Sequence, residues 1–220
     1  MLDELLQRIE AVTAASQAPL DWWRAVRIPG PTVELQASAH SWEAGTHDVN
    51  AAIDAGATTL LLVQLEPAGA LARALGAVFC RTDATAVVPV CASDLDWMGE
   101  CATIRDAMPE VRERLADLPS LLRADACLAW TTAAILQAAA RRTPIIASGA
   151  AVSMAALCAA RLAPAAEQWV AVGLADGDPA GVLARSRLGK QAWLTSSIEL
   201  GHQAHVDMLM TAAAALDEQR

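Results

Sequence analysis

Short apolar runs alternate along the chain with stretches whose apolar residues recur at helical spacing. Three runs, Thr58–Leu65, Thr143–Ala147 and Gln168–Gly173, are apolar at nearly consecutive positions, as in strands that are covered on both faces of a parallel sheet. Strands that alternate with helices are typical of an α/β fold. We therefore predict one domain over residues 1–220, with a mainly parallel sheet in a three-layer αβα architecture.

The first helix is predicted from five apolar residues that share one helix face: Leu2, Leu5, Leu6, Ile9 and Val12. It covers about residues 1–18, because Pro19 closes it, and we expect it to pack near the C-terminal helix. Residues 19–45 carry three Pro and three Trp with little periodicity. We interpret this stretch as connecting structure that packs aromatic side chains.

The segment Thr143–Pro164 has the pattern strand, tight turn, helix. Its apolar run is broken by Ser148 and Gly149, and an Ala-rich helical stretch follows. A strand that enters a helix through such a turn places backbone N–H groups at the carboxyl edge of the sheet, where an anion can bind. An ordinary strand-to-helix connection explains the same pattern.

Caps and breakers predict where other helices begin and end. Thr46 is expected to cap a helix that Gly56 ends, and Pro67 is expected to be the first residue of the next helix.

Proline also limits the elements of the middle of the chain. A strand over Ala84–Cys91 would be short or at an edge because of Pro89. Ser93 opens a helical region, which Pro109 is expected to divide. Further helices are predicted over Leu121–Ala140, Gly181–Gly189 and Leu200–Leu216, with a brief strand at Trp193-Leu194.

The charge balance argues against a nucleic-acid partner. Asp and Glu number 25 against 16 Lys and Arg, the net charge is −9, and the Arg residues are scattered rather than gathered in a run. No apolar stretch reaches the roughly 18 to 20 residues of a membrane helix. We therefore expect a cytoplasmic protein without a membrane partner.

Cysteine and histidine spacing predicts no metal site and no cofactor. The five cysteines are odd in number and never form a CxxC pair, which argues against a disulfide framework or a zinc site. His202 and His205 have the spacing of metal ligands on a helix, but a third ligand in register is missing. Exposed or capping histidines are the preferred interpretation.

Three blocks together resemble the nicotinate-nucleotide:dimethylbenzimidazole phosphoribosyltransferase (CobT) family of cobalamin biosynthesis. They are EAGTHDVNAAIDAGATTLLLVQL, AAARRTPIIASGAAVSMAALCAARLAP and DPAGVLARSRLG, which follow one another as the family's segments do. The resemblance covers residue 43 to the C-terminus and lacks the family's long DHG-containing segment. It implies a CobT-like fold, a nicotinate nucleotide or a small-molecule base as ligand, and a homodimer.

The family's signatures are changed in this chain. Residues 63–71 stand where the family has a GEMGIGNTT loop, and Gly69 is the one glycine kept. Ser148 replaces an Asp that usually precedes Gly149. The family's GHRS turn falls on residues 173–176, so its His and Arg are lost.

The resemblance also implies the site residues. The family's catalytic Glu matches His202 in one alignment of LTSSIELGHQ and Glu199 in another. The imidazole of His202 can accept a proton near neutral pH, and so can the carboxylate of Glu199, so either residue could be the general base. The positions that match substrate-binding segments are Gln64, Gly69, Ser148, Gly149, Gly173, Asp176 and Gly201.

Two functions follow from this comparison. The first is a diverged, phosphoribosyltransferase-like protein of cobalamin lower-ligand biosynthesis, with activity weak or lost, because the phosphate-binding loop is changed and Glu66 within it would repel an anion. The alternative is a non-catalytic paralogue that binds a base, a nucleotide or an active partner subunit.

Overall fold

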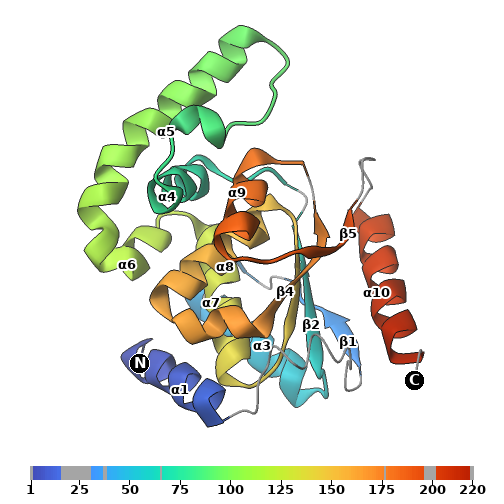
Figure 1. Cartoon of the computed structure of the whole chain (residues 1–220). Helices are drawn as coiled ribbons and strands as arrows, with labels where there is room; N and C mark the ends of the chain where they lie inside the picture. The colour runs from blue at the N-terminus through green and yellow to red at the C-terminus, as the bar shows by residue number, and fades with distance from the viewer. Residues whose placement is uncertain are drawn as a thin grey trace.

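The computed structural model describes residues 2–15, 31–36, 39–64, 66–175, 177–195 and 202–218. Its centre is a five-stranded, wholly parallel sheet with strand order β1-β2-β3-β4-β5 (Figure 1). The strands are β1 (Thr32–Glu34), β2 (Thr59–Val63), β3 (Ile145–Ser148), β4 (Val170–Ala175) and β5 (Ala192–Thr195). The three strands predicted from apolar runs are confirmed as β2, β3 and β4, and β3 is the central strand.

The helices form a layer on each face of this sheet. They are α1 (Leu2–Ala15), α3 (Trp42–Asp54), α4 (Ala70–Cys80), α5 (Asp94–Arg114), α6 (Leu118–Leu122), α7 (Ala126–Ala140), α8 (Ala150–Leu162), α9 (Pro179–Arg187) and α10 (His202–Glu218), with 3-10 turns η1 (Ala84–Ala86), η2 (Leu115–Asp117) and η3 (Pro164–Trp169). When parallel strands lie in chain order, right-handed crossovers place every connecting helix on one face. Figure 1 shows α3, α7, α8 and α9 on that face and α10 on the other. The predicted three-layer α/β architecture is thus confirmed.

The core follows from the apolar runs. Every residue of β2 and β3 is buried, and Leu60 pairs with Ile145 in the parallel register. On the opposite face, α10 buries Val206 and Leu209 against the sheet. A Cβ at Gly173 would lie 2.7 Å from a methyl of Leu209 and 2.8 Å from one of Ile146, so glycine there lets α10 approach the sheet closely.

Strand β1 was not predicted from the sequence. It lies in the stretch that was interpreted as connecting structure, because three residues with one apolar side chain, Val33, carry no periodic signal. Backbone pairing with β2 forms it: Thr32 aligns with Thr59 and Glu34 with Leu61. About half of the Pro- and Trp-containing stretch 19–45, namely residues 19–30 with 37 and 38, lies outside the described residues.

Two predicted helix starts are corrected by local hydrogen bonds. Helix α3 begins at Trp42 rather than at Thr46, because the hydroxyl of Ser41 accepts from the Ala44 amide at 3.1 Å and caps it. Helix α4 begins at Ala70, three residues later than expected, with Gly69 as its N-cap.

Pro109 does not divide its helix. α5 continues through it to Arg114, although the Arg105 carbonyl four residues earlier loses its helical partner. Both residues are exposed, so water can hydrogen-bond to this carbonyl. The expected edge strand over residues 84–91 is absent, and η1 stands there instead.

The helix predicted over residues 121–140 is two helices. α6 ends at Leu122, and α7 begins after Asp125, whose carboxylate accepts from the Leu128 amide at 3.0 Å. An acidic N-cap inside an apolar stretch was the missed signal.

Helix α1 packs against α7 and η3, where Ile9 is fully buried. The Glu10 carboxylate accepts from the Ala165 amide at 3.4 Å. This corrects the expected neighbour, because α10 lies across the sheet from α1 (Figure 1). In the described part of the chain, no helix combines the length and apolarity needed to cross a membrane.

Candidate active site

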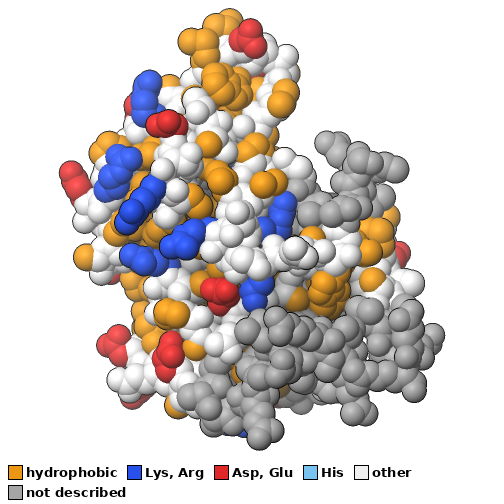
Figure 2. Space-filling view, viewed as in Figure 1, with side chains coloured by type: hydrophobic (Ala, Val, Ile, Leu, Met, Phe, Trp, Pro, Cys, Tyr) orange, Lys and Arg blue, Asp and Glu red, His pale blue; other side chains and the backbone are white. Residues whose placement is uncertain are grey.

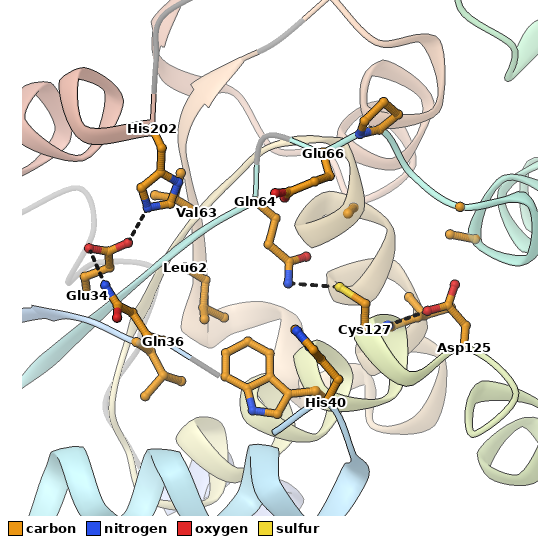
Figure 3. Close-up of a pocket in the computed structure, with 17 residues that line it drawn as sticks. Glu34, Gln36, His40, Leu62, Val63, Gln64, Glu66, Asp125, Cys127 and His202 are labelled. Carbon is orange, nitrogen blue, oxygen red and sulfur yellow. Dashed lines mark hydrogen bonds and ion pairs between the residues drawn. The ribbon is translucent and has the colours of Figure 1, made fainter. Parts of the chain in front are cut away.

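A cavity of about 620 Å³ lies beyond the carboxyl ends of β1 and β2. Its walls come from the residues after these strands, the first turns of α4 and α7, and single residues of α8 and α10. Figure 3 shows His202 with Glu34 on one side and Gln64, Cys127 and Asp125 on the other. The carboxyl edge of a parallel sheet is where α/β proteins bind ligands.

Gln64 is held in a fixed orientation at this cavity. Its side-chain Nε2 donates to Thr131 Oγ1 at 3.1 Å and to Cys127 Sγ at 3.2 Å. The Thr131 hydroxyl donates its own hydrogen to the Cys127 carbonyl at 2.8 Å, so its oxygen must accept from Gln64, which fixes the amide orientation. The Gln64 Oε1 atom is then buried without a hydrogen-bond partner among the described residues.

Gly149 fixes the backbone of Gln64. It has φ of +100°, and a Cβ there would lie 1.8 Å from the Gln64 carbonyl oxygen. The Gln64 amide donates to the Ser148 carbonyl at 3.2 Å. The backbone of the turn at Gly149 therefore lies in direct contact with the backbone of Gln64, and only glycine allows this approach.

His202 and Glu34 form the polar pair of the cavity. The His202 Nε2 atom lies 2.7 Å from Glu34 Oε1, with side chains 50% and 20% exposed (Figure 3). A carboxylate oxygen accepts this hydrogen bond, so Nε2 carries the hydrogen, and in the neutral imidazole Nδ1 keeps a lone pair. That nitrogen is a candidate proton acceptor.

Ser148 faces away from the cavity, toward α10. Its Oγ lies 2.7 Å from His205 Nε2 and donates to the Leu174 carbonyl at 3.2 Å, and both side chains are buried. His202 and His205 thus engage different partners. No group of three metal-ligating side chains gathers among the residues whose placement is described.

The cavity is acidic. Glu34, Glu66 and Asp125 line it, and no Lys or Arg does so within the described ranges. Burial raises the pKa of the Cys127 thiol, and the negative charges of Asp125 and Glu66 raise it further against hydrogen bonds that lower it. At neutral pH this thiol is protonated, so it is not a nucleophile.

The structure brings some of the predicted site residues together. Gln64, Gly69 and His202 line the cavity, Gly149 supports it from behind, and Gly173 lies under α10. Asp176, Glu199 and Gly201 lie outside the described residues.

Sequence reasoning missed several polar lining residues, among them Glu34, Gln36, His40, Asp125 and Cys127. Glu34 ends a strand that carried no signal. Asp125 was detectable as the N-cap of α7.

Comparison with known proteins agrees with this architecture. Residues 29–219 match the model of the family DBI_PRT, described as phosphoribosyltransferase. The nicotinate-nucleotide–dimethylbenzimidazole phosphoribosyltransferase of Streptomyces avermitilis is 35% identical over 191 residues, which cover 83% of this chain and 51% of that protein. The enzyme of the same name from Mycobacterium tuberculosis is 35% identical over 181 residues, covering 78% and 50%.

Solved structures show the same fold. CobT from Thermus thermophilus superimposes with a TM-score of 0.70 at 20% identity, covering 80% of this chain and 54% of that chain. A second structure, of the phosphoribosyltransferase from the same organism, gives 0.65 at 21% identity, covering 80% and 53%. The chain spans about half the length of the relatives it matches. On the family match and the identity over most of its residues, this chain belongs to the DBI_PRT phosphoribosyltransferase family.

Proposed function

We propose that the chain is a diverged nicotinate-nucleotide:dimethylbenzimidazole phosphoribosyltransferase-like protein of cobalamin lower-ligand biosynthesis, with transfer activity weak or lost. The observation that carries this proposal is the charge of the cavity. It offers a proton acceptor and hydrogen-bond acceptors, but within the described residues no cation lines it. Such a cavity favours a neutral or cationic aromatic base over an anionic nucleotide.

His202 is the proposed general base. In the transfer, a ring nitrogen of the base attacks the ribose carbon of the nicotinate nucleotide, nicotinate leaves, and the base loses its N–H proton. The lone pair on His202 Nδ1 accepts that proton, while Glu34 at 2.7 Å holds the ring and stabilises the resulting imidazolium. Glu199 stays the alternative base from the family alignment.

The lack of a Lys or Arg among the described lining residues is the reason that we expect weak transfer. The nucleotide phosphate needs N–H donors or cationic side chains, and Glu66 stands in the segment that supplies them in the family resembled. Glu66 is exposed at the cavity, where its charge repels the phosphate.

Gln64 Oε1 supplies a site for a donor group of the ligand. A buried carbonyl oxygen without a partner costs free energy, and an N–H or O–H of a bound ligand removes that cost. Because Gln64 and His202 lie on opposite sides of the cavity (Figure 3), one ligand that spans it can engage both.

The test separates binding from turnover. Isothermal titration with dimethylbenzimidazole and with nicotinate mononucleotide should show that the base binds and that the nucleotide binds far more weakly. Gln64→Met should weaken base binding, whereas Gln203→Met, on an exposed position outside the cavity, should not.

Chromatography of mixtures with both substrates measures α-ribazole phosphate. An ordinary enzymatic rate contradicts the loss of activity, and absence of base binding contradicts the site. Base binding with no product at high protein concentration identifies the non-catalytic paralogue.

A homodimer is part of the same proposal. Val90, which precedes α5, is 99% exposed, and Leu95 and Met98 in the first turns of α5 are 80% and 60% exposed. This end of α5 projects from the rest of the molecule (Figure 1). Apolar side chains gathered on such a projection mark an interface. A second copy of the chain is the partner, because one patch can pair with itself across a two-fold axis.

A further inference from the structure

A second depression, of about 630 Å³, lies at the C-terminal ends of α4, α8 and α9. Arg81, Arg161 and Arg187 line it, and Glu167 is the one carboxylate among its described lining residues. Figure 2 shows Lys and Arg side chains close together on the face that carries α4, α5 and α8. The whole chain has a net charge of −9, so this depression is a local positive region on an acidic protein.

The guanidinium groups of these three residues form no hydrogen bond and no ion pair within the described part of the chain. Arg161 does lie over the Phe79 ring at 6.0 Å. The contrast is Arg73, which is 3% exposed and holds Asp178 at 2.6 Å. The three arginines therefore keep their N–H donors available for a ligand.

The helix dipole accounts for an arginine at the C-terminus of each helix. It does not account for all three arginines lining the same depression. A cation near a helix C-terminus is stabilised by the dipole of that helix. α4, α8 and α9 pack against one another. The arginines at their C-terminal ends therefore line one depression. Glu167 supplies one negative charge against three guanidinium groups. It also interacts with Lys190, whose pKa is lowered by burial and raised by the charge of Glu167.

The basic depression is separate from the acidic cavity. Helix α8 joins them: Ala151 in its first turn lines the cavity and Arg161 in its last turn lines the depression. Its 13 residues span about 20 Å at 1.5 Å per residue. The two ends of one helix layer thus carry sites of opposite charge.

We propose that this depression binds a small molecule through a phosphoryl group, most favourably a diphosphate. Guanidinium groups bind phosphate oxygens in pairs, and the volume lies in the range of small-molecule sites. Arg112 lines the adjoining hollow with Arg81 and one carboxylate, Asp83, and its guanidinium can contact a second phosphoryl group. The proposal is independent of turnover in the acidic cavity.

The test is isothermal titration of the full chain with inorganic pyrophosphate, and separately with ADP, at matched ionic strength. We expect saturable binding. The triple variant Arg81→Gln, Arg161→Gln, Arg187→Gln should weaken it by at least about tenfold, since charge-assisted hydrogen bonds are lost. Arg8→Gln, at an exposed position of α1, removes one positive charge away from the depression and should leave binding unchanged.

The ligands distinguish the source of the phosphoryl group. Tighter binding of ADP identifies a nucleotide, equal binding identifies a free diphosphate, and both support the site. All three substituted residues are exposed, so the triple variant should still fold and unfold cooperatively, with at most a small loss of melting temperature because three favourable helix-dipole interactions are removed. Absence of saturable binding, or equal binding by the triple variant and the wild type, overturns the proposal.

Discussion

The imidazole of His202 and the carboxylate of Glu34 meet at 2.7 Å although 168 positions separate them in the sequence. The contact joins the first strand of the sheet to the helix on its far face. If His202 is the base, His202→Ala should lower whatever α-ribazole phosphate production is measurable by about 10²- to 10⁴-fold. His47→Ala is the matched control, because His47 is 79% exposed on α3. If neither His202→Ala nor Glu199→Ala changes the rate, the assignment of the base is wrong.

Removing the charge of Glu66 should favour an anionic ligand. Glu66→Gln eliminates a repulsion that is worth about 1 kcal/mol near solvent, so nicotinate mononucleotide should bind several-fold more tightly by isothermal titration. Glu113→Gln makes the same change on the exposed face of α5. Equal gains in both variants would show that net charge, rather than Glu66, controls the affinity.

Ser148→Ala should destabilise the fold. The change removes a buried hydroxyl that lies 2.7 Å from His205 Nε2 and donates to the Leu174 carbonyl at 3.2 Å, and the loss of such buried hydrogen bonds costs about 1–3 kcal/mol. Urea unfolding measures the loss against Ser186→Ala, an exposed serine on α9. A loss no larger than in that control would mean that this bond contributes little to holding α10.

Cys158 should make stability fall at alkaline pH. Complete burial raises its pKa from 9.0 to about 12, with a smaller contribution from Asp125. Between these two pH values the thiol ionises in the unfolded chain but not in the folded one, so rising pH favours unfolding. Cys158→Ala should remove this part of the pH dependence. Parallel stability curves for both proteins across the interval between these two pKa values would contradict the expectation.

Association should depend on the exposed apolar residues at and just before the start of α5, which include Val90 and Leu95. Light scattering at micromolar concentration should give twice the chain mass of 23.0 kDa. Val90→Asp should shift it toward the monomer because it places a charge in the interface. Thr103→Asp, exposed later on the same helix, should not. A monomeric wild type would contradict the proposed homodimer.

The sequence predicts the elements that apolar patterning determines. Strands β2, β3 and β4 are continuous apolar runs, so burial on both faces is visible in the chain itself. Strand β1 forms only because β2 offers it a backbone edge, which no local pattern records. The start of α3 depended on Ser41, a cap that precedes the expected Thr46 in the sequence.

The candidate site was predicted less completely for a similar reason. Gln64, Gly69 and His202 were found through family alignment, whereas Asp125 and Cys127 reach the cavity from a helix that joins it only in three dimensions. The arginines of the basic depression are scattered in the sequence, and the packing of three helices brings them together.

The strand order has a consequence for how the protein is made. All five strands precede α10, and every crossover helix lies on the other face, so a ribosome can complete the sheet while one face is still uncovered. The cavity lacks His202 until this last helix docks on Leu61 and Ile146. Binding competence should therefore appear only after the sheet, and with it most of the hydrophobic core, is already formed.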